Sequence, residues 1–201
     1  MKRLIVAITG STGAIFGVRL LQALREAEVE THLVLSDWAR RTIEHETPHS
    51  VAEVEALASQ THDFRNQGAT ISSGSFRTAG MVVAPCSMKT LAAISQGLAD
   101  NLVHRAADVV IKEGRKLVLM VRETPLSPIH LENMLKLARL GVVILPPMPS
   151  FYNHPETISD LVNHVVARAL DHFDIDAGFA RRWDGDVRKP ARSSGAATPT
   201  K

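Results

Sequence analysis

Hydroxyl, cationic and carboxylate side chains follow several short apolar segments of this chain, and together they could hold a phosphate-bearing ligand. The hydroxyl and cationic members of this set are Ser11, Thr12, Ser36, Ser87, Lys89, Thr90 and Arg122. Lysine and arginine pair with phosphate oxygens, and arginine can do so through two nitrogens at once. Glu123 follows Arg122 directly and is a candidate acid or base. Position alone leaves open that both are surface charges at the end of a strand.

The first of these groups lies in a turn that joins a predicted strand to a predicted helix. Residues 4–8 are apolar and rich in β-branched side chains, which is typical of a strand buried on both faces. Gly10 and Gly13 give the turn conformational freedom, and a helical pattern begins at Gly13. Free N–H groups at a helix start attract an anion, most often a phosphate. The glycine spacing is not that of a dinucleotide site, so a tight turn without a ligand is the alternative.

Strand-like and helix-like segments alternate along the chain and must position these groups. We expect strands at residues 4–8, 31–35, 81–84, 116–121 and 142–145. We expect helices at residues 13–27, 38–46, 51–59, 90–96, 102–112, 128–140 and 156–173. Residues 60–79 look irregular and could form a binding loop. The alternation predicts an α/β fold with a parallel sheet between two helical layers, whose carboxyl edge gathers the polar groups in one crevice, with residues 146–152 nearby.

Composition narrows the class of protein. The 201 residues suit one domain, and we expect it to span residues 1–185, with a disordered basic tail at 186–201. The net charge of +2 requires neither nucleic acid nor a membrane surface. The single cysteine, Cys86, excludes an internal disulfide and fits a reducing compartment, so we expect a cytoplasmic protein. We interpret Cys86 as a buried packing residue, and the nine histidines show no metal-ligand spacing, so no metal site is predicted.

Several motifs in order resemble the UbiX-type flavin prenyltransferases, which include the small B subunits of phenolic-acid decarboxylase systems. The motifs are TGSTGA at 9–14, SSGSF at 72–76, PCSMKTL at 85–91, RAADV at 105–109, KE at 112–113, VRETPL at 121–126, IHLENM at 129–134 and PPMPSFY at 146–152. The likeness runs over about residues 3–184. It is nearest to the phenolic-acid branch, judged by SFRT at 75–78 and NHPET at 153–157.

This resemblance implies a fold and an activity. It implies a Rossmann-like or flavodoxin-like three-layer αβα fold that binds reduced FMN. The implied reaction joins a dimethylallyl group to N5 and C6 of the flavin without a metal ion, from dimethylallyl monophosphate or, in some relatives, the pyrophosphate. The implied product, prenylated FMN, goes to a decarboxylase of the UbiD type. The resemblance also implies a homo-oligomer, a dodecamer, with its sites at subunit contacts.

The resemblance assigns roles to residues of this chain. It implies FMN contacts at Gly10, Ser11, Thr12, Ser36, Ser87, Met88, Lys89, Thr90 and Arg122. It implies a prenyl-phosphate site made by Lys112, Glu123, Tyr152 and Arg168. The implied catalytic residues are Glu123, Lys112, Glu46 and Thr12. Many relatives have serine where this chain has Thr12, which keeps the hydroxyl but adds a methyl group and restricts the side chain.

Two alternative functions are considered. The chain could be an FMN-binding accessory subunit without catalysis of its own, but such a subunit would not need the prenyl-phosphate set. It could also be a flavin-dependent cysteine decarboxylase. That class usually has an active-site histidine and an asparagine-containing cofactor motif where this chain has Ser87, Met88, Lys89 and Thr90, so the prenyltransferase interpretation is favoured.

Overall fold

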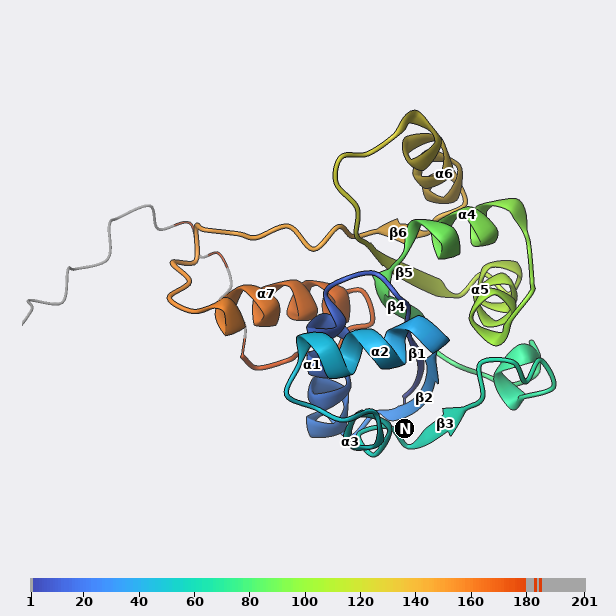
Figure 1. Cartoon of the computed structure of the whole chain (residues 1–201), viewed down its shortest axis with the longest axis horizontal. Helices are drawn as coiled ribbons and strands as arrows, with labels where there is room; N and C mark the ends of the chain where they lie inside the picture. Colours follow the sequence, from blue (N-terminus) through green and yellow to red (C-terminus); the bar gives the residue numbers. More distant parts are fainter. Residues whose placement is uncertain (1, 180–182, 184, 186–201) are drawn as a thin grey trace, which may run out of the picture.

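A computed structural model describes residues 2–179, Trp183 and Gly185 (Figure 1). The predicted basic tail at 186–201 and part of the end of the predicted 1–185 domain therefore lie outside the described residues. The described strands form one parallel sheet in the order β3-β2-β1-β4-β5-β6. They are β1 (Arg3–Ile8), β2 (Glu30–Leu35), β3 (Gln60–His62), β4 (Gly80–Cys86), β5 (Lys116–Val121) and β6 (Val143–Ile144).

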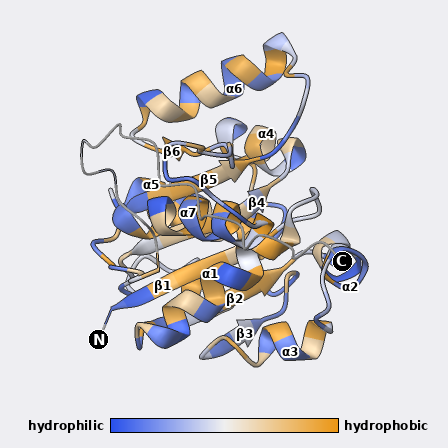
Figure 2. Ribbon diagram, turned by 90° about the vertical axis from the view of Figure 1, so that its left-hand side faces the viewer, coloured by the Kyte–Doolittle hydropathy of each residue, from blue (hydrophilic) through white to orange (hydrophobic). Residues whose placement is uncertain are grey.

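Helices cover both faces of the sheet. They are α1 (Ala14–Glu26), α2 (Asp37–Glu46), α3 (Val51–Glu55), α4 (Met88–Gln96), α5 (Leu102–Lys112), α6 (Pro128–Arg139) and α7 (Ile158–Asp171). Alternate side chains of β1 point to opposite sides, so Val6 packs with α1 and α7 whereas Ile5 packs with α4, α5 and α6. Figure 2 shows the resulting hydrophobic strands between the helical layers. The predicted three-layer α/β fold is confirmed.

The strand order defines where a ligand can bind. The order 3-2-1-4-5-6 is that of the Rossmann fold, and without the short edge strand β3 the remaining five strands have the flavodoxin-like order. The chain leaves β1 toward β2 on one side and later returns to form β4 on the other side. The two strands thus flank a topological switch point, and ligands of open α/β sheets bind beyond the carboxyl ends of strands at such a point.

The main departure from the predicted elements concerns residues 51–79. The predicted helix at 51–59 ends at Glu55, and an edge strand, β3, begins at Gln60 in a stretch predicted to be irregular. Ser59 explains this, because its N–H donates to Thr31 Oγ1 (3.1 Å) and its hydroxyl accepts from the Thr31 N–H (3.0 Å). These two bonds fix the chain beside the start of β2 and lead it into the sheet. Farther along, residues 70–72 form a single 3₁₀ turn.

Smaller departures follow from capping and pairing. β4 continues two residues beyond the predicted strand, to Cys86, through a register irregularity and a cis Ala84–Pro85 bond. α4 begins two residues before its predicted start because Ser87 caps it. The Thr157 hydroxyl and the Asp160 side chain form a capping box that starts α7 at Ile158. β6 has two residues, because it pairs with β5 only at Val118 and Leu119.

Within the part of the chain that the structure describes, every helix is too short or too polar to cross a bilayer.

Candidate functional site

A cavity of about 370 Å³ lies at the carboxyl ends of β1, β2 and β4, at the switch point of the sheet. Its lining residues are Thr9, Gly10, Ser36, Asp37, Trp38, Phe64, Ser87, Lys89, Thr90, Asn101 and His104. The structure thus brings together five residues that the sequence predicted for an FMN site: Gly10, Ser36, Ser87, Lys89 and Thr90. The volume falls in the range of small-molecule sites.

Three helices begin at this cavity, and each has a polar cap. The Ser36 hydroxyl accepts from the Ala39 N–H (3.1 Å) at the start of α2, and the Asn101 side chain accepts from the His104 N–H (3.1 Å) at the start of α5. Ser87 caps α4: its hydroxyl accepts from the Thr90 N–H (3.3 Å) and donates to Thr90 Oγ1 (3.1 Å). The positive ends of three helices and the exposed Lys89 favour an anionic ligand.

Thr9 and Gly10 shape the floor of the cavity. The buried Thr9 hydroxyl donates to the Pro85 carbonyl (2.8 Å) and accepts from the Ser87 N–H (2.9 Å), so one side chain joins the ends of β1 and β4. A Cβ at Gly10 would overlap the Cβ of Trp38. Glycine at this position therefore lets α2 approach the turn closely enough for Trp38 to line the cavity.

The turn before α1 binds an anion, but one that the chain itself supplies. The N–H groups of Gly13 and Ala14 donate to Glu46 Oε2 at 2.7 and 3.1 Å, so a carboxylate takes the position where the sequence predicted a phosphate. Gly13 has a φ of +100°, which glycine adopts without strain. In the same turn Thr12 is exposed, and the buried Ser11 Oγ has no hydrogen-bond partner among the described residues. The hydrogen-bonding capacity of Ser11 is thus unused within the described residues, and neither Ser11 nor Thr12 lines the cavity.

Arg122 and Glu123 follow β5 on the same edge of the sheet but do not line the cavity. The Arg122 N–H donates to the Cys86 carbonyl (3.1 Å), which places Arg122 next to the end of β4. Its guanidinium is half-buried and has no hydrogen bond to any described residue. Glu123 is exposed and accepts from the Thr124 N–H (3.0 Å). Met88, a predicted flavin contact, is not among the residues that line the cavity and packs against the core.

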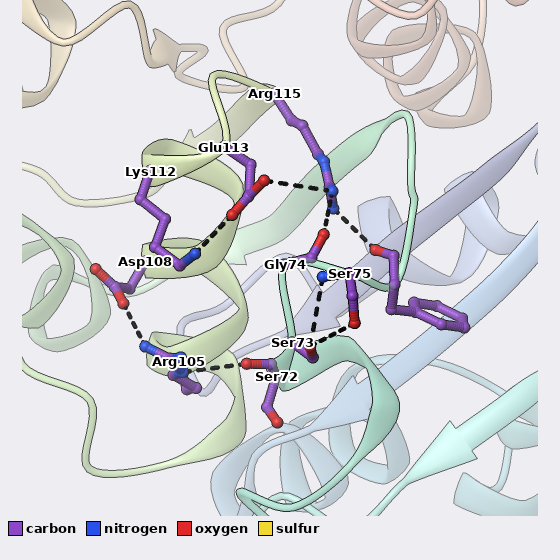
Figure 3. A network of polar contacts seen from close by, with 10 residues as sticks. Ser72, Ser73, Gly74, Ser75, Arg105, Asp108, Lys112, Glu113 and Arg115 are labelled. Atoms are coloured by element: carbon purple, nitrogen blue, oxygen red, sulfur yellow. Dashed lines mark hydrogen bonds and ion pairs between the residues drawn. The ribbon is translucent and has the colours of Figure 1, made fainter.

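Lys112 belongs to a second polar region, which we name the amino-edge cluster (Figure 3). It contains Arg105, Asp108, Lys112, Glu113, Arg115 and the loop at residues 72–76. The Lys112 ammonium donates to Glu113 Oε1 (2.6 Å), and this contact lowers the pKa of the Glu113 carboxyl. Lys112 lies eight residues beyond His104 on α5, about 12 Å along the helix axis. Lys112 is therefore at the far end of α5 from the cavity.

Basic side chains of this cluster hold the loop at residues 72–76 by its backbone. Arg115 donates to the carbonyls of Gly74 (2.6 Å) and Phe76 (2.9 Å), and Arg105 donates to the Ser72 carbonyl (3.2 Å). Arg105 also pairs with Asp108 Oδ2 at 2.7 Å. A Cβ on Gly74 would overlap a Glu113 carboxylate oxygen, so a larger residue there would require the Glu113 side chain to move.

Tyr152 and Arg168 occupy a third place, at α7. The Tyr152 hydroxyl lies 3.3 Å from His164 Nε2, and Arg168 follows His164 by one helical turn and pairs with Asp171 Oδ2 (2.8 Å). The four residues predicted for a prenyl-phosphate site are thus distributed over three places in one chain. Within the described residues, the structure does not bring Lys112, Glu123 and Tyr152 together.

Sequence reasoning missed five residues that line the cavity: Asp37, Trp38, Phe64, Asn101 and His104. Asp37 and Trp38 directly follow Ser36, a predicted FMN contact, and this position at a strand end could have identified them. Asn101 and His104 follow a helix rather than a strand, so the strand-end argument could not reach them. Burial lowers the pKa of His104, which favours the neutral imidazole.

Cys86 is fully buried, as expected, and burial raises the pKa of its thiol. A thiol in that state is a packing group rather than a nucleophile. Among the described residues, no three histidine, cysteine, aspartate or glutamate side chains are placed to hold a metal ion.

A parallel sheet with a switch-point cavity, hydroxyl caps and nearby cations defines an α/β protein that binds a phosphate-bearing ligand. Sequence comparison narrows this class, because the profile of the Flavoprotein family matches residues 1–170. A relative from Streptomyces sp. (strain D7), named a probable UbiX-like flavin prenyltransferase, is 66% identical over 198 residues, which cover 97% of this chain and 99% of the relative.

Two solved structures share both the fold and much of the sequence. A dodecameric FMN-dependent UbiX-like decarboxylase from Escherichia coli O157:H7 is 66% identical, with a TM-score of 0.90, over 91% of this chain and 100% of that chain. AnUbiX (PadA1) in complex with FMN and dimethylallyl pyrophosphate is 54% identical, with a TM-score of 0.91, over 92% of this chain and 98% of that chain. The chain belongs to the UbiX-type flavin prenyltransferases within the Flavoprotein family.

Proposed function

We propose that this protein transfers a dimethylallyl group from dimethylallyl monophosphate to N5 and C6 of reduced FMN and so makes prenylated FMN. The observation that carries the proposal is the switch-point cavity, where Gly10, Ser36, Ser87, Lys89 and Thr90 converge in a chain of this family. The monophosphate is our choice of donor. The pyrophosphate, which is bound in the AnUbiX structure, is the alternative donor compared in the assay below.

The residues of the cavity fit FMN. The caps Ser36 and Ser87, with Thr90 and Lys89, would hold its phosphate, because hydroxyl groups and an ammonium converge there with three helix starts. The buried Ser11 Oγ lacks a partner among the described residues and can bond to a polar group of the same ligand. When bound, reduced FMN supplies the electron-rich ring that traps an allylic cation.

The protein's task is then to break the allylic carbon–oxygen bond of the donor. The electron pair of that bond leaves with the phosphate, so negative charge develops on phosphate oxygens. Lys112 and Arg168 would stabilise this charge, and the Tyr152 hydroxyl would donate a hydrogen bond to it. Glu123, whose carboxyl group is exposed at the end of β5, would transfer a proton to the departing phosphate.

Thr12 and Glu46 complete the proposed catalytic set at the start of α1. The Glu46 carboxylate binds the N–H groups of Gly13 and Ala14, which fixes the turn that carries the exposed hydroxyl of Thr12. The threonine hydroxyl would lie beside the flavin, next to the Gly10 wall of the cavity. The proposal for Thr12 therefore depends on the turn that Glu46 holds.

In a homo-oligomer, Lys112 of one copy could reach the prenyl donor bound to another copy. Since Lys112 and the cavity lie at opposite ends of α5, we propose that Lys112 acts on the donor bound to a neighbouring copy. Large apolar side chains on α6 and in the segment after β6 are exposed, among them Ile129 (68%) and Leu135 (51%) on α6 and Phe151 (68%) after β6, which supports burial against another copy. A dodecamer, the assembly named for the E. coli O157:H7 structure, is the proposed form.

The proposed recipient of the product is a decarboxylase of the UbiD type that acts on an aromatic acid in the cytoplasm. Prenylated FMN is a cofactor rather than an end product, so its release to a second enzyme completes the function.

Mass analysis of the flavin after an anaerobic reaction tests the proposal. The protein is incubated with reduced FMN and either dimethylallyl monophosphate or the pyrophosphate, and the flavin is extracted. A flavin heavier by one C5 unit, formed faster with the monophosphate, is the expected result. Unmodified FMN with both donors would contradict the proposal and would leave an FMN-binding accessory subunit as the better interpretation. Release of CO₂ from a cysteine-ended peptide would indicate a cysteine decarboxylase.

A further inference from the structure

Tyr152 makes a contact that the proposed mechanism does not use. Its ring lies between His164 and Trp183 in edge-to-face contact with both, at centroid distances of 5.5 and 5.6 Å. Its hydroxyl lies 3.3 Å from His164 Nε2. Tyr152 is 46% exposed, whereas His164 is buried in α7. The imidazole therefore supports Tyr152 from the protein side and leaves the rest of the tyrosine open to a ligand.

The other nitrogen of His164 is also engaged. The side-chain amide nitrogen of Asn153 lies 3.4 Å from His164 Nδ1. In this orientation of the Asn153 amide the nitrogen donates to the imidazole, so Nδ1 accepts and carries no proton. Burial lowers the pKa of His164, and the nearby Arg168 lowers it further, while Asp171 acts in the opposite direction. A neutral imidazole that accepts at Nδ1 must carry its proton at Nε2, the nitrogen next to Tyr152.

This proton arrangement fixes the direction of the hydrogen bond to Tyr152. His164 Nε2–H donates, and the Tyr152 oxygen accepts. The tyrosine's own O–H proton is then not used by any residue that the structure describes and can be donated to another acceptor. Had the tautomer been reversed, the Tyr152 hydroxyl would donate to Nε2, and its proton would be unavailable to a ligand.

We propose that His164 is a positioning residue that keeps the Tyr152 hydroxyl available as a hydrogen-bond donor to the phosphate that leaves the allylic substrate. Asn153 takes part by holding the tautomer of His164. This inference rests on the proposed function for its catalytic consequence. The contact itself is a property of the protein without substrate and can be tested separately.

Tyr152 is the only tyrosine in the chain, so its signal can be read without assignment. The full-length protein is labelled with ¹³C at the tyrosine ring carbon that bears the oxygen. H164F, which keeps a ring but removes the N–H, should shift this resonance. H164Q, whose amide can donate in its place, should move the resonance back toward the parental position. H172F removes the imidazole that follows α7 and should change nothing.

Nitrogen-15 spectra of the parental histidines provide a second test, in which the H164Q variant serves only to assign the resonance. The resonance that disappears in H164Q belongs to His164, and it should report a proton on Nε2 and none on Nδ1. The opposite tautomer would overturn the proposal, as would a Tyr152 resonance that is identical in the parent, H164F and H164Q.

Kinetics test the catalytic consequence. H164F should lower kcat for prenyl transfer about tenfold, the effect of one oriented hydrogen bond, with unchanged FMN affinity, and H164Q should recover part of the loss. In a Y152F background H164F should cost almost nothing more, because both changes remove the same donor. Fully additive losses would contradict the proposal. If the parent makes no prenylated flavin, the proposed function fails, while the two spectroscopic tests still decide whether His164 orients Tyr152.

Discussion

The switch-point cavity and the amino-edge cluster lie near opposite ends of α5 and are built differently. The cavity is made of neutral caps, such as Ser36 and Ser87, whose bonds to their helix starts are complete within one chain. The amino-edge cluster is made of charged groups, such as Lys112 and Glu113, which neutralise each other near the surface. The cavity is a preformed binding site. The amino-edge cluster contains paired charges that could instead interact with a ligand or a neighbouring copy.

This difference suggests a division between binding and chemistry. Helix caps and strand ends are local features, so one copy of the chain can complete a flavin-binding cavity by itself. Lys112 lies at the opposite end of α5 from the cavity, which supports the proposal that it acts on a substrate bound to another copy. We therefore expect changes in the cavity to alter flavin affinity, and changes in the cluster to alter the reaction rate.

The largest effect is expected from K112M. Loss of the ammonium that stabilises the leaving phosphate should lower the rate of prenyl transfer by about 10²–10³, while the FMN affinity stays the same. Single-turnover assays with extracted flavin measure the rate, and flavin fluorescence measures the affinity. K116M, an exposed lysine change at the start of β5 nearby, is the matched control. A K112M protein that loses FMN binding to the same extent would remove the distinction between the two regions.

Mixing two inactive variants tests whether the regions cooperate between copies. E123Q should bind FMN but transfer the prenyl group slowly, as K112M does. If each site takes Lys112 from one copy and Glu123 from another, hetero-oligomers reassembled from an equal mixture should recover about a quarter of the parental rate. Each variant reassembled alone serves as the control. Recovery no greater than the average of the two variants would show that the two residues do not belong to different copies.

A smaller effect is expected from S87A, which changes the cavity. Loss of the cap and of a phosphate contact should weaken FMN binding about tenfold. Riboflavin, which lacks the phosphate, should bind the parent and S87A with similar affinity. S50A is the matched control, because Ser50 caps α3 through the same type of bond, away from the cavity. Equal losses in S87A and S50A would mean that the effect is on stability rather than on the ligand.

The smallest effect on activity is expected from E30Q. This variant tests whether the ion pair of Glu30 with Arg3, at the start of β2, makes the stability of the fold sensitive to acid. Glu30 Oε1 accepts from Arg3 Nε (2.7 Å) and lies 3.0 Å from His32 Nε2, and these partners, Arg3 first, lower the pKa of Glu30 from 4.5 to about 2. The ionised form therefore stabilises the fold above pH 4.5, and this stability is lost as the pH falls toward 2.

The expected loss in the free energy of unfolding for E30Q is about 1–2 kcal/mol at pH 7, after allowance for solvent screening of this partly exposed pair. Urea unfolding midpoints at pH 7 and pH 3 measure it, with E44Q as the control on the exposed face of α2. E30Q should be less stable than the parent at pH 7, and the difference should shrink at pH 3. A difference that grows in acid would reverse the assigned sign.

Features that depend on neighbouring residues are predicted well from the sequence. Features that depend on contacts between residues far apart in the chain are not. The apolar runs at β1 and β5 depend on neighbouring residues, and both agree with the structure. β3 was missed because its three residues become a strand only by pairing with β2, and the bonds between Ser59 and Thr31 that guide it join distant positions.

The same difference between local and distant contacts explains which residues of the site could be predicted from the sequence. Residues that follow strands, such as Ser87 and Lys89, could be predicted to lie at one edge, since the parallel sheet gathers its strand ends. His104 could not, because it reaches the cavity from the first turn of a helix that follows another helix. Nor could any local pattern reveal that Glu46 binds the N–H of Gly13, a contact that depends on how α2 packs beside α1.

The burial of Cys86 has a consequence for work with air-sensitive flavin. Reduced flavin that meets oxygen generates peroxide, and peroxide attacks thiolates on accessible cysteines. The chain has one cysteine, which is the last residue of β4 and is fully enclosed in the core, and its raised pKa keeps the sulfur protonated. Leaked oxygen should thus consume the substrate flavin and spare the thiol of the catalyst, so that activity lost in air returns when reductant and fresh FMN are supplied.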